Sequence, residues 1–292
     1  MTRPGSRCRD GCIPFTCYNV DKAVPRLNYP QNDTAEEREA MSDTPTASDA
    51  AHLLTNLAQA RPGHHQQIAA HELPAELALL RTFQSRRLAM THADLLASPR
   101  YHPAAEFFLT DVYAPRDFSQ RDADLQRFYE GVSRVLPERA VSILAHVVAL
   151  SNLTNDLDAR LIRALVDELG VTDSITPQQY AAGYRICDNY DERLRQIKLI
   201  GDIGYGIDRL VHIPFVAIAL RLAHAPAVLA GWSELQHYLE HGFTAFKHMK
   251  GAEGFLATID HRETAILDRI FAGEVDPFAV SDDGAQGSKR DS

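Results

Sequence analysis

The sequence predicts an all-α protein, built as a helical bundle or an orthogonal helical array of about eight helices. Two observations carry this prediction. Through most of the chain, apolar residues recur with the 3.6-residue period of amphipathic helices, and no segment alternates apolar and polar residues as a strand does. Prolines, glycines and capping residues separate these periodic segments at helix-length intervals.

The first half of the chain supplies four predicted helices, at residues 74–97, 103–113, 119–136 and 138–170. A proline at the start of the first two suits a first helical turn, where no backbone N–H is needed. Ser119 with an acidic residue three positions later indicates the start of the third helix. An apolar stripe that runs as far as Gly170 indicates that the fourth is one long helix.

The second half supplies four more predicted helices, at residues 177–200, at a short segment from Pro214, at 226–250 and between Gly251 and Gly273. Thr176 is a capping residue for the first of these. Three glycines, at positions 201, 204 and 206, predict a loosened segment before Pro214.

The polar ends predict a single domain with two disordered extensions. Residues 1–48 are rich in Pro, Asp, Thr, Ser and Asn and show no period, which predicts a disordered leader. Met41 is a candidate true start, in which case the leader would be an over-long gene assignment. Residues 49–278 then form one helical domain, and residues 279–292 a disordered tail.

Charge and composition limit the function classes. A net charge of −9, without a basic cluster, disfavours binding to nucleic acid or to anionic lipid. No signal peptide is visible, and the most apolar run, residues 210–220, is too short for a membrane span, so a cytoplasmic location is expected. Cys8, Cys12 and Cys17 form a cluster, but no fourth ligand lies at zinc-site spacing, and an unstructured segment is favoured.

One short segment carries a family resemblance. Residues 107–113 read Phe-Phe-Leu-Thr-Asp-Val-Tyr, with Phe107, Phe108, Leu109 and Tyr113 in place and substitutions at the other three positions. The segment resembles the signature of the bacterial FFLEELY motif proteins, as do the residues that follow at 119–124 and a later segment at 235–246. The resemblance implies a helical bacterial protein, and because that family has no established activity it implies no catalytic residue.

The sequence also offers metal-ligand candidates. His237, His241 and His248 fall on one side of the predicted helix 226–250, within about 40° of one another. Other polar residues share that side, so a solvated face is favoured over a metal or haem site, and no cofactor is predicted.

Charges that interrupt apolar stripes are more informative. Glu263 lies within the apolar arc of the last helix, and Arg87 within that of the first, where Asp94 shares its face. Asp158 and Asp191 interrupt the stripes of their own helices. Because a buried charge without a partner costs several kcal/mol, these groups should pair with each other or with a ligand. Arg87 with Glu263 is the favoured pair, in a structural network rather than in a polar pocket.

Two functional hypotheses follow. The favoured one is a non-enzymatic protein that acts through contacts with itself or with an unknown protein partner, since no catalytic or cofactor motif is found. The alternative is a ligand- or metal-binding helical enzyme, of a ferritin-like or haem-oxygenase-like kind, with a polar pocket inside the bundle. For Phe107, which lies beside the apolar stripe of its helix, we expect coverage by another segment of the chain.

Overall fold

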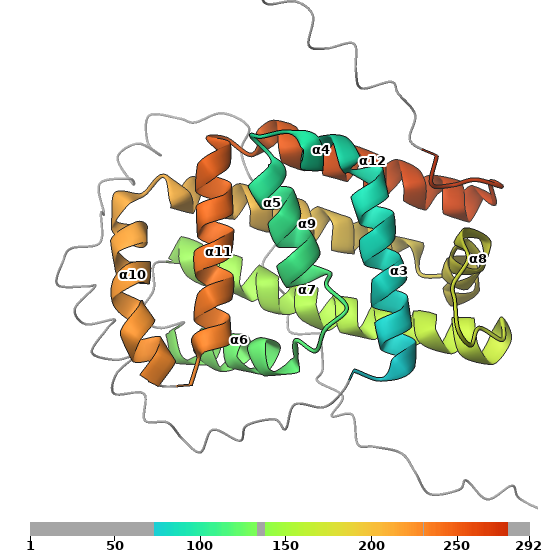
Figure 1. Cartoon of the computed structure of the whole chain (residues 1–292), viewed down its shortest axis with the longest axis horizontal. Coiled ribbons are helices and arrows are strands. Elements are labelled where there is room, and N and C mark those ends of the chain that lie inside the picture. The colour runs from blue at the N-terminus through green and yellow to red at the C-terminus, as the bar shows by residue number, and fades with distance from the viewer. Residues whose placement is uncertain (1–72, 133–137, 230, 280–292) are drawn as a thin grey trace, which may run out of the picture. The chain divides into compact units, whose positions relative to one another are not determined.

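The computed structural model describes residues 73–132, 138–229 and 231–279. All of them belong to the second of two units into which contacts divide the chain, Pro45–Ser292. Within these ranges the chain forms ten α-helices and no strand, which confirms the all-α prediction (Figure 1). The predicted leader at 1–48 and nearly all of the predicted tail at 279–292 lie outside the described residues.

The helices are labelled as in Figure 1. The first five are α3 (Ala75–Thr91), α4 (Ala93–Ala97), α5 (His102–Phe107), α6 (Ser119–Val132) and α7 (Glu138–Arg163). The last five are α8 (Pro177–Cys187), α9 (Tyr190–Val211), α10 (Pro214–Leu229), α11 (Ser233–Met249) and α12 (Glu253–Ala272). Two π-helical turns, η2 (Phe108–Val112) and η3 (Ala164–Glu168), extend α5 and α7.

Two of the predicted helices are each divided in two, which is why ten helices are found instead of about eight. The predicted helix 74–97 breaks at His92, whose φ of −114° and ψ of 29° are not helical. The predicted helix 177–200 ends at Cys187, and Asp188 then adopts a left-handed conformation with φ of 46°. Thr176 does cap α8, in a full capping box with Gln179.

The glycines that were expected to loosen the chain instead lie inside α9, and they allow neighbouring helices to approach it. A Cβ atom at Gly204 would lie 2.5 Å from Cδ2 of Leu256 on α12. A Cβ atom at Gly206 would lie 2.7 Å from Cγ1 of Ile143 on α7. Close packing on two sides therefore outweighs the low helix propensity of glycine. The predicted helix start at Pro226 is also wrong, because α10 continues to Leu229 and α11 begins at Ser233.

The helices cross one another at steep angles. Figure 1 shows α3, α5, α10 and α11 running across the direction of α7, α9 and α12. Helix α9 lies between α7 and α12 and packs extensively against both. The described part of the chain is therefore an orthogonal array rather than a parallel bundle.

Two hydrophobic clusters make up the core. One joins α4, α5, α11 and the first half of α12, and it includes Phe107, Phe246 and Phe255. The other joins α3, α7, α8 and the second half of α12, and it includes Leu80 and Tyr180. Helix α12 contributes to both clusters, so its middle passes from one to the other.

One helical stretch, Arg139–Glu168, has the length and hydropathy of a membrane span. It comprises α7 and η3 and differs from the run at 210–220 that is most apolar in the sequence. Its side chains include the buried Asp158, and it packs along α9 within the array. Core helices of soluble proteins meet the same criteria, so this property alone assigns no location.

Candidate functional site

A polar cavity lies where the two hydrophobic clusters meet. Its volume is about 100 Å³, and residues of α3, α7, α8, α9, α12 and η2 line it. Apolar side chains of both clusters, such as Phe255 and Ile266, form part of its wall. The polar side chains that line it are Gln84, Arg87, His92, Tyr113, Thr154, Asp158, Tyr180, Tyr184, Arg193, Gln196 and Glu263.

On one side of the cavity, Glu263 is held by two cationic or hydrogen-bonding partners. Nη1 of Arg87 donates to both carboxylate oxygens of Glu263, at 2.6 Å to Oε1. Nε2 of His92 lies 2.9 Å from the same Oε1. Burial opposes ionisation of Glu263, but the Arg87 guanidinium and the His92 hydrogen bond outweigh it, and the pKa of Glu263 falls to about 2. At neutral pH Arg87 and Glu263 therefore form an ion pair.

A second acidic residue also lines the cavity, and its ionisation is disfavoured. Asp158 is only 3% exposed, and its Oδ1 accepts a hydrogen bond of 3.0 Å from Nε2 of Gln84. Burial raises the pKa of the Asp158 carboxyl above its usual value, although Arg193 and Gln84 partly oppose this. The cavity thus contains one carboxylate that is firmly ionised and one that is driven toward its neutral form.

Arg193 is a buried cation of the cavity wall. It is 3% exposed, and among the described residues it forms no ion pair. Its Nη2 donates to the carbonyl oxygen of Leu157 at 3.2 Å, and its guanidinium lies 4.3 Å from the ring centroid of Tyr184. Its Nη1 donates to Oε1 of Gln196 at 3.3 Å. Burial opposes the charge of Arg193, but Tyr184, Tyr180 and Asp158 outweigh burial and raise its pKa, so the guanidinium is stabilised without a carboxylate at ion-pair distance.

Two donors of the cavity wall lack an acceptor. Nε of Arg87 and Nε of Arg193 are buried without a hydrogen-bond partner among the described residues, as is the ring atom Nδ1 of His92. The hydroxyls of Tyr180 and Tyr184 lie 2.8 Å apart, and burial raises the pKa of Tyr184 well above 10, so that it stays protonated. Burial likewise raises the pKa of Tyr113. The unpaired guanidinium nitrogens of Arg87 and Arg193 are thus the donors of the wall that a bound ligand could satisfy.

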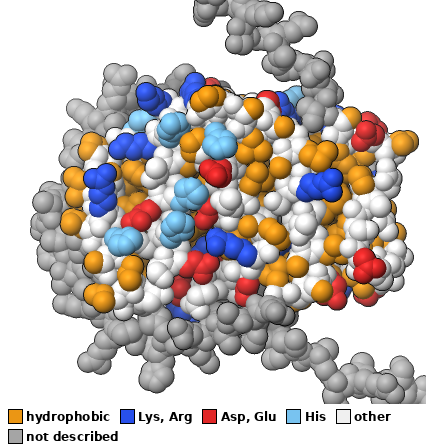
Figure 2. Space-filling model, viewed as in Figure 1, with side chains coloured by type: hydrophobic (Ala, Val, Ile, Leu, Met, Phe, Trp, Pro, Cys, Tyr) orange, Lys and Arg blue, Asp and Glu red, His pale blue; other side chains and the backbone are white. Residues whose placement is uncertain are grey.

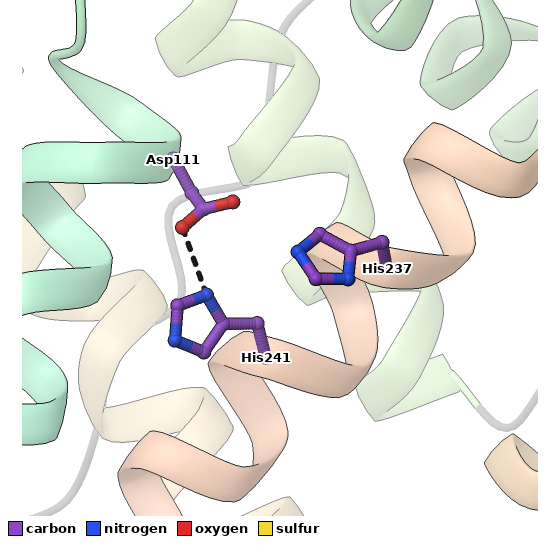
Figure 3. A group of neighbouring side chains, drawn as sticks. All are labelled: Asp111, His237 and His241. Atoms are coloured by element: carbon purple, nitrogen blue, oxygen red, sulfur yellow. Dashed lines mark hydrogen bonds and ion pairs between the residues drawn. The ribbon is translucent and has the colours of Figure 1, made fainter.

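A second group of polar side chains lies on η2 and α11, away from the cavity. One ligand atom each from Asp111, His237 and His241 lie within 4.8 Å of one another (Figure 3). His248 of the same helix is not part of the group, since its Nε2 lies 3.1 Å from the carbonyl oxygen of Pro99. Of the three histidines singled out in the sequence, two are thus brought together.

Comparison with known proteins places most of this structure in one family. The model of the family described as "Domain of unknown function (DUF8198)" matches residues 63–277. The chain belongs to the DUF8198 family. No curated protein and no solved structure matches it significantly.

The DUF8198 region contains every polar residue of the cavity wall and all three members of the group on η2 and α11. The description of the family names no activity. The resemblance of residues 107–113 to the FFLEELY motif proteins stays a prediction.

Of the five charges that the sequence singles out, three line the cavity of the DUF8198 domain and two do not. Arg87, Asp158 and Glu263 lie at the cavity, and Arg87 pairs with Glu263. Asp94 instead pairs with Arg262, and its side chain is 58% exposed. The break at His92 explains this correction, because it turns α4 relative to α3 and moves Asp94 off the face that Arg87 occupies.

Asp191 is also exposed, so its assignment to a buried network is wrong. The stripe of Tyr180 and Tyr184 ends with α8, and Asp191 lies in the first turn of α9. A carboxylate is favourable there because the first turn carries the positive end of the helix dipole. Sequence reasoning missed Arg193, although it lies at helical spacing from Gln196, Ile200 and Ile203 once α9 begins at Tyr190.

The segment 107–113 contributes to both groups of polar residues. Phe108, Leu109 and Tyr113 line the cavity. Phe107 is 4% exposed and packs against α11, with its ring centroid 5.4 Å from that of Tyr238. Another segment of the chain therefore covers Phe107, as expected from the sequence.

Proposed function

We propose that this protein binds a small organic anion, of the short-chain carboxylate class, in its polar cavity. The observation that supports the proposal most directly is Arg193, a buried guanidinium at the cavity without an ion-pair partner among the described residues. Buried arginines commonly pair with carboxylates or phosphates, which match the planar fork of the guanidinium. A bound carboxylate would supply that missing partner.

The charges around the cavity favour an anion over a cation or a neutral ligand. Arg87 is neutralised by the ionised Glu263, whereas burial drives Asp158 toward its neutral form. Arg193 forms no ion pair among the described residues, and in a region of low dielectric constant an added carboxylate would be strongly attracted to it. The unpaired nitrogens of the wall add donors that oxygen atoms of the ligand can accept from.

The size and walls of the cavity limit the rest of the ligand. A cavity of about 100 Å³ is smaller than the engineered 150 Å³ cavity that holds benzene, so the ligand has about four to six non-hydrogen atoms. Leu88, Ile197 and Phe255 form apolar parts of the wall. Such a wall suits a short hydrocarbon group attached to the carboxylate.

A comparison of acids with their amides tests this proposal. The full chain is heated in acetate, propionate or butyrate, and in acetamide, propionamide or butyramide, at equal ionic strength. We expect at least one acid to raise the unfolding midpoint while its amide does not, because only the acid pairs with Arg193. A ligand at one hundred times its Kd stabilises the folded state by about 2.7 kcal/mol.

Two variants separate cavity binding from a general salt effect. Arg193→Met removes the charge that binds the acid and should abolish the stabilisation. Arg262→Met removes an arginine of an exposed pair outside the cavity and should leave the stabilisation intact. Equal stabilisation by acids and amides, or an unchanged response of Arg193→Met, would contradict the proposal.

Contact with another protein chain is the second candidate function, and the outward face of α10 favours it. Ile218, Leu222 and Leu229 are 54%, 53% and 88% exposed, and the first two lie one turn apart on the same side of the helix. Exposed apolar clusters of this kind are typical of interaction surfaces. Light scattering of the wild type and of the Ile218→Glu, Leu222→Glu double variant tests it, since loss of self-association in the variant is expected if the partner is a second copy.

A further inference from the structure

Asp111, His237 and His241 come from two elements that are far apart in the sequence but adjacent in space. Asp111 lies on η2, and the two histidines lie one turn apart on α11. Their ligand atoms fall within 4.8 Å of one another (Figure 3). In Figure 2, several histidines and charged side chains gather on the face of the molecule over α5 and α11.

The π turn and a buried arginine place the carboxylate. The amide of Tyr113 donates to the carbonyl of Phe108, five residues earlier, at 2.9 Å, which closes the wider turn. Nη1 of Arg121, a buried residue, donates to the backbone carbonyl of Asp111. Asp111 is itself 4% exposed. The π turn and Arg121 therefore fix the backbone of Asp111, and this backbone directs the carboxylate toward α11.

The histidine nearest to this carboxylate is also held in position. Nδ1 of His241 lies 2.8 Å from Oδ2 of Asp111, and the hydroxyl of Thr110 donates to the same oxygen at 2.7 Å. The ring of Phe107 meets that of His241 edge to face, with centroids 5.4 Å apart. Gly242 permits this contact, since a Cβ atom there would lie 3.0 Å from Cζ of Phe107.

The opposite side of the group is open. His237 is exposed, and its ring centroid lies 5.8 Å from that of His241. Arg116 is the cation nearest to the carboxylate, with its Nη2 at 3.5 Å from Oδ1 of Asp111. Its side chain is 48% exposed, so it can move into solvent when another cation arrives. An ion can therefore reach the group directly from water.

We propose that Asp111, His237 and His241 form a binding site for a divalent transition-metal ion, with Zn²⁺ as the ion to test first. Two imidazole nitrogens and one carboxylate oxygen suit Zn²⁺ and its neighbours in the first transition row, whereas Mg²⁺ and Ca²⁺ prefer oxygen ligands alone. With metal–ligand bonds of about 2.0–2.2 Å, tetrahedral ligands lie about 3.3 Å apart, so a pair of ligand atoms at the present limit of 4.8 Å closes by about 1.5 Å, while Nδ1 of His241 and Oδ2 of Asp111, now 2.8 Å apart, separate slightly. The exposed ring of His237 can make that movement.

Three protein ligands leave one position of a tetrahedral ion for water. The open side at His237 places that position toward solvent. Zinc sites with three protein ligands and a water are of the reactive type, whereas structural sites are closed by four. This site lies apart from the polar cavity, and none of its three residues lines that cavity. The metal proposal therefore does not depend on the anion proposal.

Calorimetric titration of the full chain with Zn²⁺ tests the site. The protein carries no histidine tag, and Cys8, Cys12 and Cys17 are replaced by serine in every variant so that their thiols bind no zinc. We expect one Zn²⁺ to bind the parent protein, and the affinity to fall by roughly 100-fold or more in His237→Ala, His241→Ala and Asp111→Asn.

His248→Ala is the matched control, because His248 lies on the same helix outside the group. The Zn²⁺ affinity of this variant should equal that of the parent protein. Thermal unfolding of each metal-free variant verifies that it is folded. If the variants of the buried Asp111 or of His241 do not fold, His237→Ala still tests the site, because truncation of this exposed side chain should not destabilise the protein. No saturable binding at micromolar Zn²⁺, an unchanged affinity of Asp111→Asn, or equal losses in His248→Ala and His237→Ala would each overturn the proposal.

Discussion

Two arginine–carboxylate pairs link neighbouring residues of α12 to α3 and α4, and they differ in geometry and in burial. Arg262 binds Asp94 through both terminal nitrogens, at 2.6 and 2.9 Å. Glu263 instead accepts at both oxygens from the single nitrogen Nη1 of Arg87, and its Oε1 also lies 2.9 Å from Nε2 of His92. The exposed fractions are 22% and 58% in the first pair and 13% for both members of the second.

The difference in burial predicts different contributions of the two pairs to stability. In the outer pair, water screens the charges and can solvate each of them when the pair opens. In the inner pair, removal of one member leaves the other charge with neither water nor a partner. The inner pair also borders the cavity, so its ionisation determines the electrostatic environment of a bound ligand.

Replacement of Glu263 by glutamine should have the largest effect. The variant keeps the shape of the side chain but leaves the Arg87 guanidinium buried without a counter-charge. We expect the free energy of unfolding to fall by about 3–5 kcal/mol, measured by urea denaturation at neutral pH. An additional Arg87→Met substitution should recover part of the loss, because it removes the unpaired charge. A loss no larger than that of an exposed pair would show that the cavity hydrates Arg87.

Acid should weaken the inner pair in the wild-type protein. Because the pKa of Glu263 is lowered from 4.5 to about 2, the folded state loses the stabilisation as the pH falls through this range. This lowering of the pKa corresponds to about 3 kcal/mol of stabilisation of the folded state, which is fully present above pH 4.5. We therefore expect the difference in unfolding free energy between wild type and Glu263→Gln to shrink markedly between pH 7 and pH 3. A difference that stays constant over this range would mean that Glu263 is not ionised in the folded protein.

Much of the fold was predictable, because helical periodicity and proline or glycine punctuation are local properties of the sequence. The all-α class and most helix starts follow from them. The breaks at His92 and at Asp188–Asn189 were not predictable in this way, since polar residues there fit a continuous helix equally well. The glycines of α9 misled for a similar reason. What keeps Gly204 and Gly206 helical is the approach of α7 and α12, which no local pattern reveals.

The residues of the candidate sites also fall into those that local patterns predict and those that only the tertiary structure reveals. Arg87 and Glu263 could be paired from sequence because each interrupts an apolar arc within an unbroken helix. Asp94 and Asp191 were misassigned because their arcs were extended across breaks, and Arg193 was missed because the start of α9 was not located. The proximity of Asp111 to His241 depends on a π turn and on the packing of η2 against α11, which sequence spacing does not encode.

Asp94→Asn should have the smallest effect on the free energy of unfolding, because it breaks the exposed pair rather than the buried one. Asp94 is bound by Arg262 but remains largely exposed, and the Arg262 hydrogen bond lowers the pKa of its carboxyl. Exposed pairs contribute about 0.2–1 kcal/mol, so we expect a loss within that range. Sodium chloride should reduce this loss further, because the Debye length falls from about 10 Å at 0.1 M to about 3 Å at 1 M salt. The loss in Glu263→Gln should change less over the same range, because salt screens a buried pair much less than an exposed one. If salt reduced both losses in parallel, the inner pair would be as accessible to solvent as the outer one, and burial would not be what distinguishes them.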